Sequence, residues 1–324
     1  MSHPPVELGT FPTPVEPAPR LATAIGLGPE NLWIKRDDLT GLGGGGNKIR
    51  KLEWTVGAAL AEGANTLVTT GAPQSNHARL TAAAGARLGL DVVLVLRGSP
   101  GASHSGNLVL DGLLGARLVW AGDVDQEGLD RAAAEACRRL RSRGARPALV
   151  PFGGSNALGA RGYVRCGEEL RRQVPDMRHT VVALGSGGTM AGLVAALGAR
   201  AVLGVDVGAL AEPAEAVCRF ADPLTSAPVT PEDLRVRRDQ VGAGYGRLTA
   251  PVASALTLAA RTEGLILDPV YTGRALAGLV AAVADGDIGP GDKTVLVHTG
   301  GLPGLFGHAE AVAYAEHGIT AHER

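Results

Sequence analysis

The sequence predicts an α/β protein made of two open, twisted, parallel-sheet domains with helices on both faces. Short apolar segments alternate with amphipathic helical segments along most of the 324 residues, which is typical of βαβ units. A chain of this length is also long enough for two domains of ordinary size. We expect a small α/β domain over residues 55–157 and a large domain formed by residues 1–54 and 158–324.

The first half of the chain supplies most of this alternation. A proline-rich segment over residues 1–20 is expected to be extended. Apolar residues recur at helical spacing between Asn47 and Glu62, and Gly63 stops the pattern, so one helix is predicted there. The same reasoning predicts strands over residues 32–35, 66–70, 92–96, 117–120 and 148–152, and helices over residues 78–88, 107–114 and 126–143.

The second half continues the pattern with longer loops. The glycine-rich sequence 153–162 enters a helix that ends near Gln173, and we interpret it as the crossing between the domains. A polar stretch from Pro223 to Tyr245 is expected to be less regular. Strands are predicted over residues 180–184, 201–207 and 294–298 and just before Asp268, and helices from about Thr189 and over residues 250–262, 273–284 and 305–316.

The composition argues against several classes of function. The net charge is -1 and no basic run occurs, which argues against nucleic acid and anionic membrane as partners. Three widely spaced cysteines, Cys137, Cys166 and Cys218, lack metal-ligand spacing and suit a reducing compartment. The first residues contain no apolar run of signal-peptide length, and no apolar run of membrane-spanning length occurs in the sequence. We therefore expect a cytoplasmic protein with no metal site.

The stretch from Asp38 to Glu53 is the strongest candidate for chemistry. Lys48 follows four glycines and Asn47, where a loop gives way to a good helix former. The helix macrodipole disfavours a cation at this end by about 0.3–1 kcal/mol, which lowers the pKa of an amine and favours its nucleophilic form. Such an amine can form a Schiff base. The alternative is a flexible loop that leaves Lys48 solvated.

A second glycine-rich loop, residues 185–192, lies between a predicted strand and a predicted helix. Its glycines let the backbone approach an anion closely, and Ser186 and Thr189 add hydroxyl donors at the positive end of the helix. The loop is typical of a phosphate site but could also be a tight turn. It fits the dinucleotide pattern loosely, and Asp206 has roughly the spacing of a ribose ligand, so a dinucleotide oxidoreductase remains an alternative.

Three further loops follow predicted strands, and the carboxyl ends of parallel strands converge on one crevice. Ser75 and Asn76 stand at a helix start, where they can hold a carboxylate or simply cap the helix. Tyr271 is a candidate acid or hydrogen-bond partner, and Thr299 offers an uncharged hydroxyl to a ring nitrogen. An amine, a phosphate site and a carboxylate loop together favour pyridoxal phosphate over other cofactors.

Six motifs in order along nearly the whole chain resemble the D-cysteine desulfhydrase and 1-aminocyclopropane-1-carboxylate deaminase family, which are pyridoxal phosphate enzymes of the tryptophan synthase β-subunit fold type. These motifs are Arg-Asp-Asp-Leu-Thr-Gly at 36–41, Gly-Gly-Asn-Lys-Ile-Arg-Lys-Leu-Glu at 45–53, Gln-Ser-Asn-His at 74–77, Gly-Ser-Gly-Gly-Thr at 185–189, Asp-Pro-Val-Tyr-Thr-Gly at 268–273 and His-Thr-Gly-Gly at 298–301.

The resemblance implies a cofactor in the cleft between the domains, joined to Lys48 as a Schiff base. The cofactor contacts that it implies are Asn76 at the ring oxygen, Thr299 at the ring nitrogen, and Lys51, Gly185, Ser186, Gly187, Gly188 and Thr189 at the phosphate. The substrate contacts that it implies are Ser75, Asn76, His77, Tyr245, Tyr271 and Thr272, with Ser75 and Tyr271 also catalytic. A homodimer is the habit of the family.

The resemblance also implies a reaction, an α,β-elimination in which Lys48 takes the α-proton and Tyr271 assists the leaving thiol. Thr272 and Thr299 replace a glutamate and a leucine of the deaminase pattern, which favours D-cysteine as substrate. Arg247 is an extra cation that would suit an acidic substrate such as L-cysteate, and Gly43-Gly44 suggest a looser loop. A 1-aminocyclopropane-1-carboxylate deaminase and a non-catalytic binding protein with this fold remain alternatives.

Overall fold

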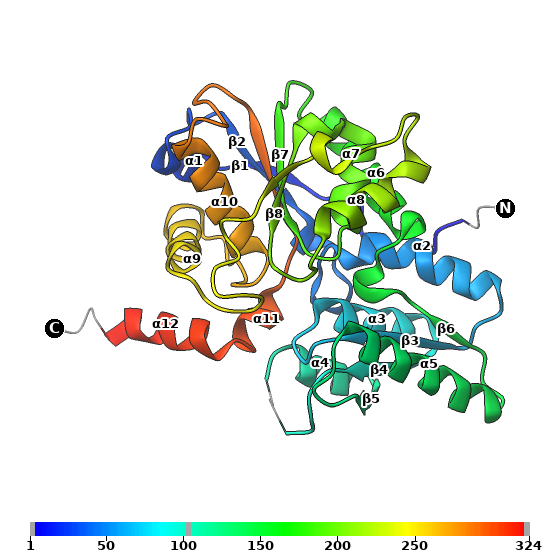
Figure 1. Cartoon of the computed structure of the whole chain (residues 1–324). Helices are drawn as coiled ribbons and strands as arrows, with labels where there is room; N and C mark the ends of the chain where they lie inside the picture. The colour runs from blue at the N-terminus through cyan, green and yellow to red at the C-terminus, as the bar shows by residue number, and fades with distance from the viewer. Residues whose placement is uncertain (1–3, 102–104, 321–324) are drawn as a thin grey trace.

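Two units share the chain, each built on its own sheet (Figure 1). The computed structural model describes residues 4–101 and 105–320. A six-stranded sheet has the order β1-β2-β10-β7-β8-β9, and a four-stranded sheet has the order β5-β4-β3-β6. The strands are β1 (Val15–Pro17), β2 (Leu32–Arg36), β3 (Thr66–Gly71), β4 (Asp91–Leu96), β5 (Arg117–Trp120), β6 (Pro147–Leu149), β7 (His179–Leu184), β8 (Val202–Asp206), β9 (Arg235–Arg237) and β10 (Thr294–His298).

Helices cover both faces of each sheet, as the alternation of segments predicts. They are α1 (Pro19–Ile25), α2 (Lys48–Ala61), α3 (Asn76–Leu88), α4 (Asn107–Leu113), α5 (Gln126–Ser142), α6 (Ala157–Gln173), α7 (Gly188–Leu197), α8 (Pro213–Ala221), α9 (Ala250–Glu263), α10 (Thr272–Ala284), α11 (Leu302–Phe306) and α12 (Ala309–Thr320). None of the helices in the described ranges is long and apolar enough to cross a membrane.

The larger sheet has a separate apolar core on each face. Side chains of α1, α9 and α10 fill one core, and side chains of α6, α7 and α8 fill the other. All neighbouring strands of this sheet are parallel except β1, which pairs antiparallel with β2. The predicted α/β class is therefore confirmed, with one antiparallel strand at the sheet edge in a segment that we expected to be merely extended.

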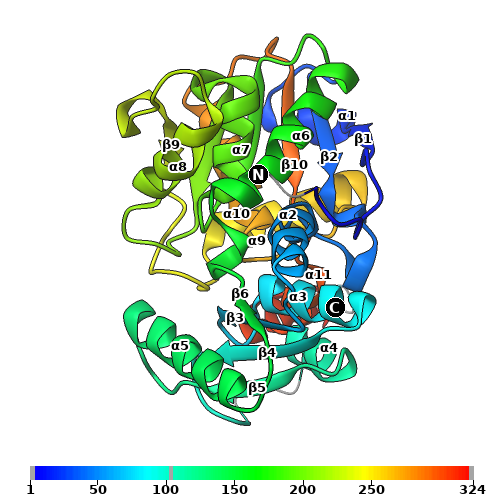
Figure 2. The same ribbon diagram turned by 90° about the vertical axis from the view of Figure 1, so that its right-hand side faces the viewer.

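The smaller sheet is entirely parallel and lies between α2, α3 and α4 on one side and α5 on the other. Figure 2 shows α5 on the face of this sheet turned away from α3. The strand predicted over residues 148–152 is shorter than expected, because β6 ends at Leu149 and a single 3-10 turn, Phe152–Gly154, follows. That turn leads from the small unit back toward the large one.

Helix α2 lies between the two units and packs on both (Figures 1 and 2). Its apolar side chains Ile49, Leu52 and Val56 belong to the core of the small unit. On its other side, α6 approaches so closely that a Cβ at Gly162 would stand 2.1 Å from the carbonyl oxygen of Arg50. The boundary predicted after residue 54 thus falls inside one continuous helix, which fixes Lys48 relative to both sheets.

Several local predictions were wrong. Helices α1 and α8 and the edge strand β9 were not expected. Each is short, with seven, nine and three residues, so each offers few positions from which a period can be read. The helix predicted over residues 305–316 is two helices, α11 and α12, separated at Gly307 and His308. The strand expected directly before Asp268 is absent from the described structure: residues 264–268 form no strand, and a turn follows at Pro269 and Val270.

Candidate active site

A cavity of about 170 Å³ lies between the two units. Residues at or just after the carboxyl ends of strands line it. They are Gly71 at the end of β3, Arg97 after β4, Gly185 after β7, Gly208 after β8 and Thr299 after β10. Loops converge at this edge of parallel sheets, which is where such folds bind ligands. The predicted crevice is thus present, and it is shared by both sheets.

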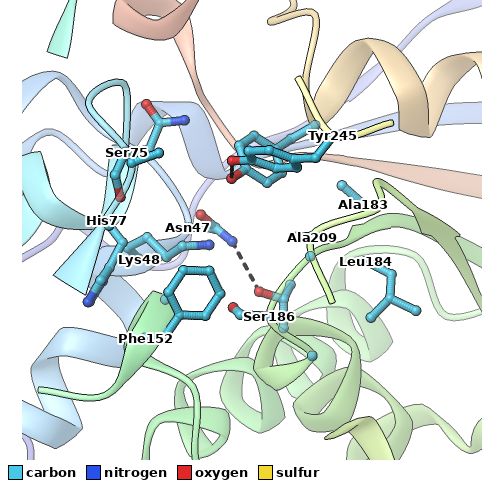
Figure 3. Close-up of a pocket in the computed structure, with 18 of the residues that line it drawn as sticks. Asn47, Lys48, Ser75, His77, Phe152, Ala183, Leu184, Ser186, Ala209 and Tyr245 are labelled. Atoms are coloured by element: carbon cyan, nitrogen blue, oxygen red, sulfur yellow. Dashed lines mark hydrogen bonds between the residues drawn. The ribbon is translucent and has the colours of Figure 1, made fainter. Parts of the chain in front are cut away.

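Lys48 is the first residue of α2 and points into this cavity (Figure 3). Within the described part of the chain, its Nζ has no hydrogen-bond acceptor and no carboxylate within 4.0 Å. Burial lowers the pKa of Lys48 to about 8, and the negative charge of Asp268 opposes this shift. The lowered pKa matches the expectation, but removal from water is the main cause rather than the helix terminus.

The chain has four lysines, and the other three are engaged elsewhere. Lys35 is buried against Glu169, and Lys293 pairs with Asp176 at the surface. Lys51 donates to the Ser155 hydroxyl at 3.0 Å and to the Gly153 carbonyl at 3.3 Å. Lys48 is therefore the amine that is free to react with a carbonyl compound in the cavity.

The glycine-rich loop before Lys48 is held firmly, although Gly43-Gly44 suggested a looser segment. Gly45 has φ +72°, and a Cβ there would stand 1.9 Å from the carbonyl oxygen of Asp38. The Gly46 N–H donates to the Thr40 hydroxyl at 2.8 Å, and the Asn47 N–H donates to the Thr299 carbonyl at 3.0 Å. The glycines are needed because backbone passes against backbone at this point.

The loop 185–189 forms a concave surface at the start of α7. Gly187 has φ +88°, and a Cβ at Gly188 would stand 2.8 Å from the Ser155 hydroxyl. The Ser186 hydroxyl lies 2.8 Å from the Ser155 hydroxyl, and Asn47 donates to the Thr189 hydroxyl at 3.0 Å (Figure 3). Hydroxyls and the N-terminal amides of a helix are the donors that a phosphate group requires.

Lys51 stands behind this concave surface rather than in the cavity wall. Burial, and then the positive charge of Lys48, lower its pKa well below the ordinary value. No carboxylate pairs with Lys51 in the described ranges of the chain. Its hydrogen bond to Ser155, whose hydroxyl lies against that of Ser186, connects Lys51 to the loop 185–189. An anion bound at that loop would restore the charged form of this amine, so the arrangement suits an anion there.

Ser75, Asn76 and His77 reach the cavity from the small unit (Figure 3). Ser75 also caps α3, since its hydroxyl oxygen accepts from the Ala78 N–H at 3.1 Å. Its hydroxyl hydrogen remains free to donate toward a substrate. The His77 Nε2 lies 2.8 Å from the Thr69 hydroxyl, and burial together with Lys48 and Lys51 holds the pKa of His77 well below its usual value.

Tyr245 and Tyr271 both line the cavity, and their hydroxyl oxygens lie 2.6 Å apart. The Lys48 Nζ lies 5.9 Å from the centre of the Tyr271 ring. Burial and the neighbouring Tyr245 hydroxyl raise the pKa of Tyr271, so its proton stays bound at neutral pH. The Asp268 carboxylate accepts the Tyr271 N–H at 2.9 Å and thereby orients the turn that carries this phenol.

Two predicted contacts are not brought to the cavity. Thr272 is buried, and its hydroxyl donates to the Asp268 carboxylate at 2.7 Å, so it secures the start of α10 instead of facing a substrate. Arg247 is exposed and pairs with Glu310 at 2.9 Å. The extra cation that the sequence suggested for an acidic substrate is thus neutralised at the surface.

Other residues also line the cavity, although they were not predicted from the sequence as site residues. Asn47 directly precedes Lys48 and was visible as a candidate, but its bond to Thr189 depends on two segments 142 residues apart. Arg97 follows β4, where the rule of strand ends alone could have found it. Phe152 was expected inside a strand, and it lies in the turn that leaves the small unit.

The donor set of the cavity fits pyridoxal phosphate. A reactive amine faces the cavity, a phosphate surface that a Cβ at Gly188 would fill lies opposite, and no carboxylate lines the wall among the described residues. Asp206, the candidate ribose ligand, instead accepts the Gly208 N–H at 2.8 Å and lies outside the cavity wall. Within the described ranges, no group of three possible metal ligands occurs.

The chain matches the protein family described as pyridoxal-phosphate dependent enzyme over residues 6–300. It is 40% identical over 320 residues to a putative 1-aminocyclopropane-1-carboxylate deaminase of Pyrococcus abyssi, covering 95% of this chain and 94% of the relative. It is also 40% identical over 312 residues to a D-cysteine desulfhydrase of Yersinia enterocolitica, covering 91% of this chain and 93% of the relative.

Solved structures agree with this assignment. A crystal structure described as an ACC deaminase homologue superposes with a TM-score of 0.86 at 37% identity and covers 96% of both chains. Threonine deaminase isoform 2 from Solanum lycopersicum shares the fold, with a TM-score of 0.62 at 20% identity over 89% of this chain and 79% of that one. This protein therefore belongs to the pyridoxal phosphate-dependent enzymes, in the group of the 1-aminocyclopropane-1-carboxylate deaminases and D-cysteine desulfhydrases.

Proposed function

We propose that this enzyme catalyses α,β-elimination on D-cysteine and releases pyruvate, hydrogen sulfide and ammonia. The observation that carries the proposal is the position of Lys48, a weakly basic amine that faces both the phosphate surface at 185–189 and the hydroxyl pair of Tyr245 and Tyr271. A base and an acid on the two sides of one small cavity are the groups that elimination needs.

Each part of the cavity has a role in this proposal. Pyridoxal phosphate, when bound, supplies the electron sink for the carbanion. The N–H groups at the start of α3, over residues 75–77, bind the substrate carboxylate. Lys48 anchors the cofactor and then accepts the α-proton at Nζ, which its lowered pKa permits near neutral pH. Tyr271 donates its proton to the departing thiolate, and Tyr245 replaces it.

Thr299 completes the proposal at the other end of the cavity. It is buried at the end of β10 and lines the cavity wall. Its uncharged hydroxyl would meet the cofactor ring nitrogen without protonating it. A weaker electron sink results, which disfavours transamination relative to an acidic partner and leaves elimination as the favoured outcome.

Pyruvate release from a set of amino acids tests the proposal. We expect purified holoenzyme to turn over D-cysteine faster than L-cysteine, L-cysteate and 1-aminocyclopropane-1-carboxylate, with sulfide and pyruvate formed in equal amounts. Formation of 2-oxobutanoate from 1-aminocyclopropane-1-carboxylate would identify a deaminase instead. Turnover of none of these compounds by a protein that binds the cofactor would favour the non-catalytic alternative.

A second candidate substrate is L-cysteate, and Arg97 is the observation that favours it. Arg97 lines the cavity from the end of β4 and has no carboxylate within 4.0 Å in the part of the chain that the structure describes. A sulfonate leaving group would find its positive charge there. Arg97→Met should lower kcat/KM for L-cysteate by about 10-fold or more, while D-cysteine turnover stays unchanged. An equal loss on both substrates would argue against selective binding of a sulfonate.

We also propose that two copies of the chain associate in the cytoplasm. Figure 1 shows α12 extending away from the body of the molecule. Large apolar side chains of α11 and α12 remain exposed, with Phe306 at 63% and Ile319 at 70%. Large apolar side chains left exposed on projecting helices are typical of a subunit contact. Light scattering after size-exclusion chromatography should give about twice the mass of one chain, and a monomer would contradict the proposal.

A further inference from the structure

Arg79 is completely buried, although it carries a charge and lies one turn after Asn76 on α3. Its guanidinium spans two elements of the active site. Nη1 donates to the carbonyl of Gly43 at 2.5 Å and to that of Gly45 at 3.0 Å, in the loop that leads to Lys48. Arg79 therefore joins the start of α3 to the segment that positions the reactive amine.

The same guanidinium takes part in fixing the side-chain amide of Asn76. Nη2 of Arg79 donates to Asn76 Oδ1 at 3.4 Å, and the Asn107 amide donates to the same oxygen at 3.0 Å. Nε of Arg79 also donates to Asn107 Oδ1 at 3.1 Å, which orients that second donor. With two donors on its oxygen, Asn76 can present only its N–H group to the cavity that it lines.

Asp111 is the carboxylate whose charge acts on Arg79, but it accepts no hydrogen bond from the Arg79 guanidinium. Asp111 on α4 is fully buried, and neither of its oxygens accepts a hydrogen bond in the described structure. Burial raises the pKa of Asp111 to about 7, and the charge of Arg79 opposes that rise. The Arg79 guanidinium therefore donates to carbonyl and amide oxygens of the active site. In a purely structural ion pair it would donate to a carboxylate instead.

We propose that Arg79 is a positioning residue of the active site, which turns the Asn76 N–H group toward the cofactor ring oxygen and ties that group to the loop before Lys48. This inference rests on the proposed function, because it requires pyridoxal phosphate in the cavity. A donor at the ring oxygen withdraws negative charge from it. Loss of that donor favours a proton on the neighbouring nitrogen contributed by Lys48.

The test is a pH titration of the visible absorption band of the holoenzyme. Arg79→Lys keeps the charge but cannot span the same acceptors, so the midpoint of the titration should rise by about half a pH unit or more. Arg50→Lys is the matched control. Arg50 is also buried, but it binds the carboxylates of Asp37 and Glu169, which lie outside the cavity. The control should lose stability but keep the wild-type midpoint.

Asn107→Asp provides a second variant in case Arg79→Lys fails to fold. A carboxylate at position 107 would repel Asn76 Oδ1 and turn the Asn76 oxygen toward the cavity, so the midpoint should again rise. A wild-type midpoint in both Arg79→Lys and Asn107→Asp would overturn the inference and leave the proposed function intact. A wild-type protein that develops no visible band with pyridoxal phosphate would overturn both.

Discussion

Two clusters of basic side chains lie on opposite sides of helix α2, and they differ in their partners. On the side of α6, Arg50 and Lys35 meet the carboxylates of Asp37 and Glu169 at 2.6–2.8 Å. On the side of the cavity, Lys48 and Lys51 have no carboxylate within 4.0 Å in the part of the chain that the structure describes. Carboxylates of the protein neutralise the first cluster, whereas the second cluster has no carboxylate partner and can bind an anion.

This difference separates a structural site from a binding site. Removing charges from water costs several kcal/mol per ion unless partners compensate, so a fold keeps an uncompensated pair only where a ligand supplies the missing charge. The phosphate surface at 185–189 lies next to Lys51 through Ser155 and Ser186. In the proposed function, the cofactor phosphate supplies the missing charge and the amine of Lys48 binds the cofactor aldehyde.

The largest expected effect comes from the unneutralised cluster. Lys48→Ala should remove the visible absorption band and lower kcat by at least about 10³-fold, because both the attachment point and the base are lost. Lys293→Ala is the matched control, since its amine pairs with Asp176 at the surface. Sulfide release from D-cysteine at the wild-type rate by the Lys48→Ala variant would contradict the proposed role of Lys48.

Breaking the neutralised cluster should affect stability instead. Asp37→Asn removes a carboxylate that accepts from Arg50, Thr13 and Tyr163, and should lower the free energy of unfolding by about 3–5 kcal/mol. The remaining folded enzyme should bind pyridoxal phosphate with wild-type affinity. Chemical denaturation and cofactor titration measure the two quantities, and Glu127→Gln at an exposed pair with Arg131 should change neither.

Lys51→Met sharpens the comparison, because it should move two quantities in opposite directions. The cofactor-free protein should gain about 1 kcal/mol of stability, since a buried amine that lacks a carboxylate partner is removed. The affinity for pyridoxal phosphate should fall by about 10-fold, since its phosphate loses a neighbouring charge. Denaturation of the cofactor-free protein and a spectroscopic titration test both, and loss of stability together with unchanged affinity would refute this role.

The smallest effect is a pH dependence of stability that has the same sign in the two clusters but falls in different pH ranges. The pKa of Lys48 falls from 10.5 to about 8 on folding, so between these pH values the unfolded chain binds a proton that the folded chain lacks, and stability rises with pH. Burial would raise the pKa of Asp37, but Arg50 lowers it below 3.8, so that stability is lost only in acid. Comparing cofactor-free wild type with Lys48→Met from pH 7 to 10 should reveal the first trend, whereas parallel curves would contradict it.

The sequence predicted the unneutralised side better than the neutralised side, for a physical reason. Lys48 and the loop 185–189 stand beside glycine runs, and glycine conformations are local properties of the chain. The charge network of Lys35, Arg50, Asp37 and Glu169 joins residues up to 134 positions apart. Such pairings depend on how α2 packs on α6, which no local pattern reveals.

Side-chain direction was the other property that the sequence could not supply. Thr272 adjoins Tyr271, yet the first turn of α10 directs its hydroxyl to Asp268 and away from the cavity. Arg247 follows Tyr245 by two positions, yet its guanidinium pairs with Glu310 on α12. Residues that are adjacent in sequence to a cavity residue therefore need not line the cavity themselves. Arg97, in contrast, lines the cavity although it follows a strand that is distant in sequence.

The most direct test of the account is to locate the covalent attachment of the cofactor. The holoenzyme would be reduced with borohydride, digested, and analysed by peptide mass spectrometry. We expect a reduced pyridoxyl phosphate group on Lys48 and none on Lys35, Lys51 or Lys293, which are the other lysines of the chain. Modification of Lys51 in place of Lys48, or an unmodified chain from a yellow holoenzyme, would contradict the central claim.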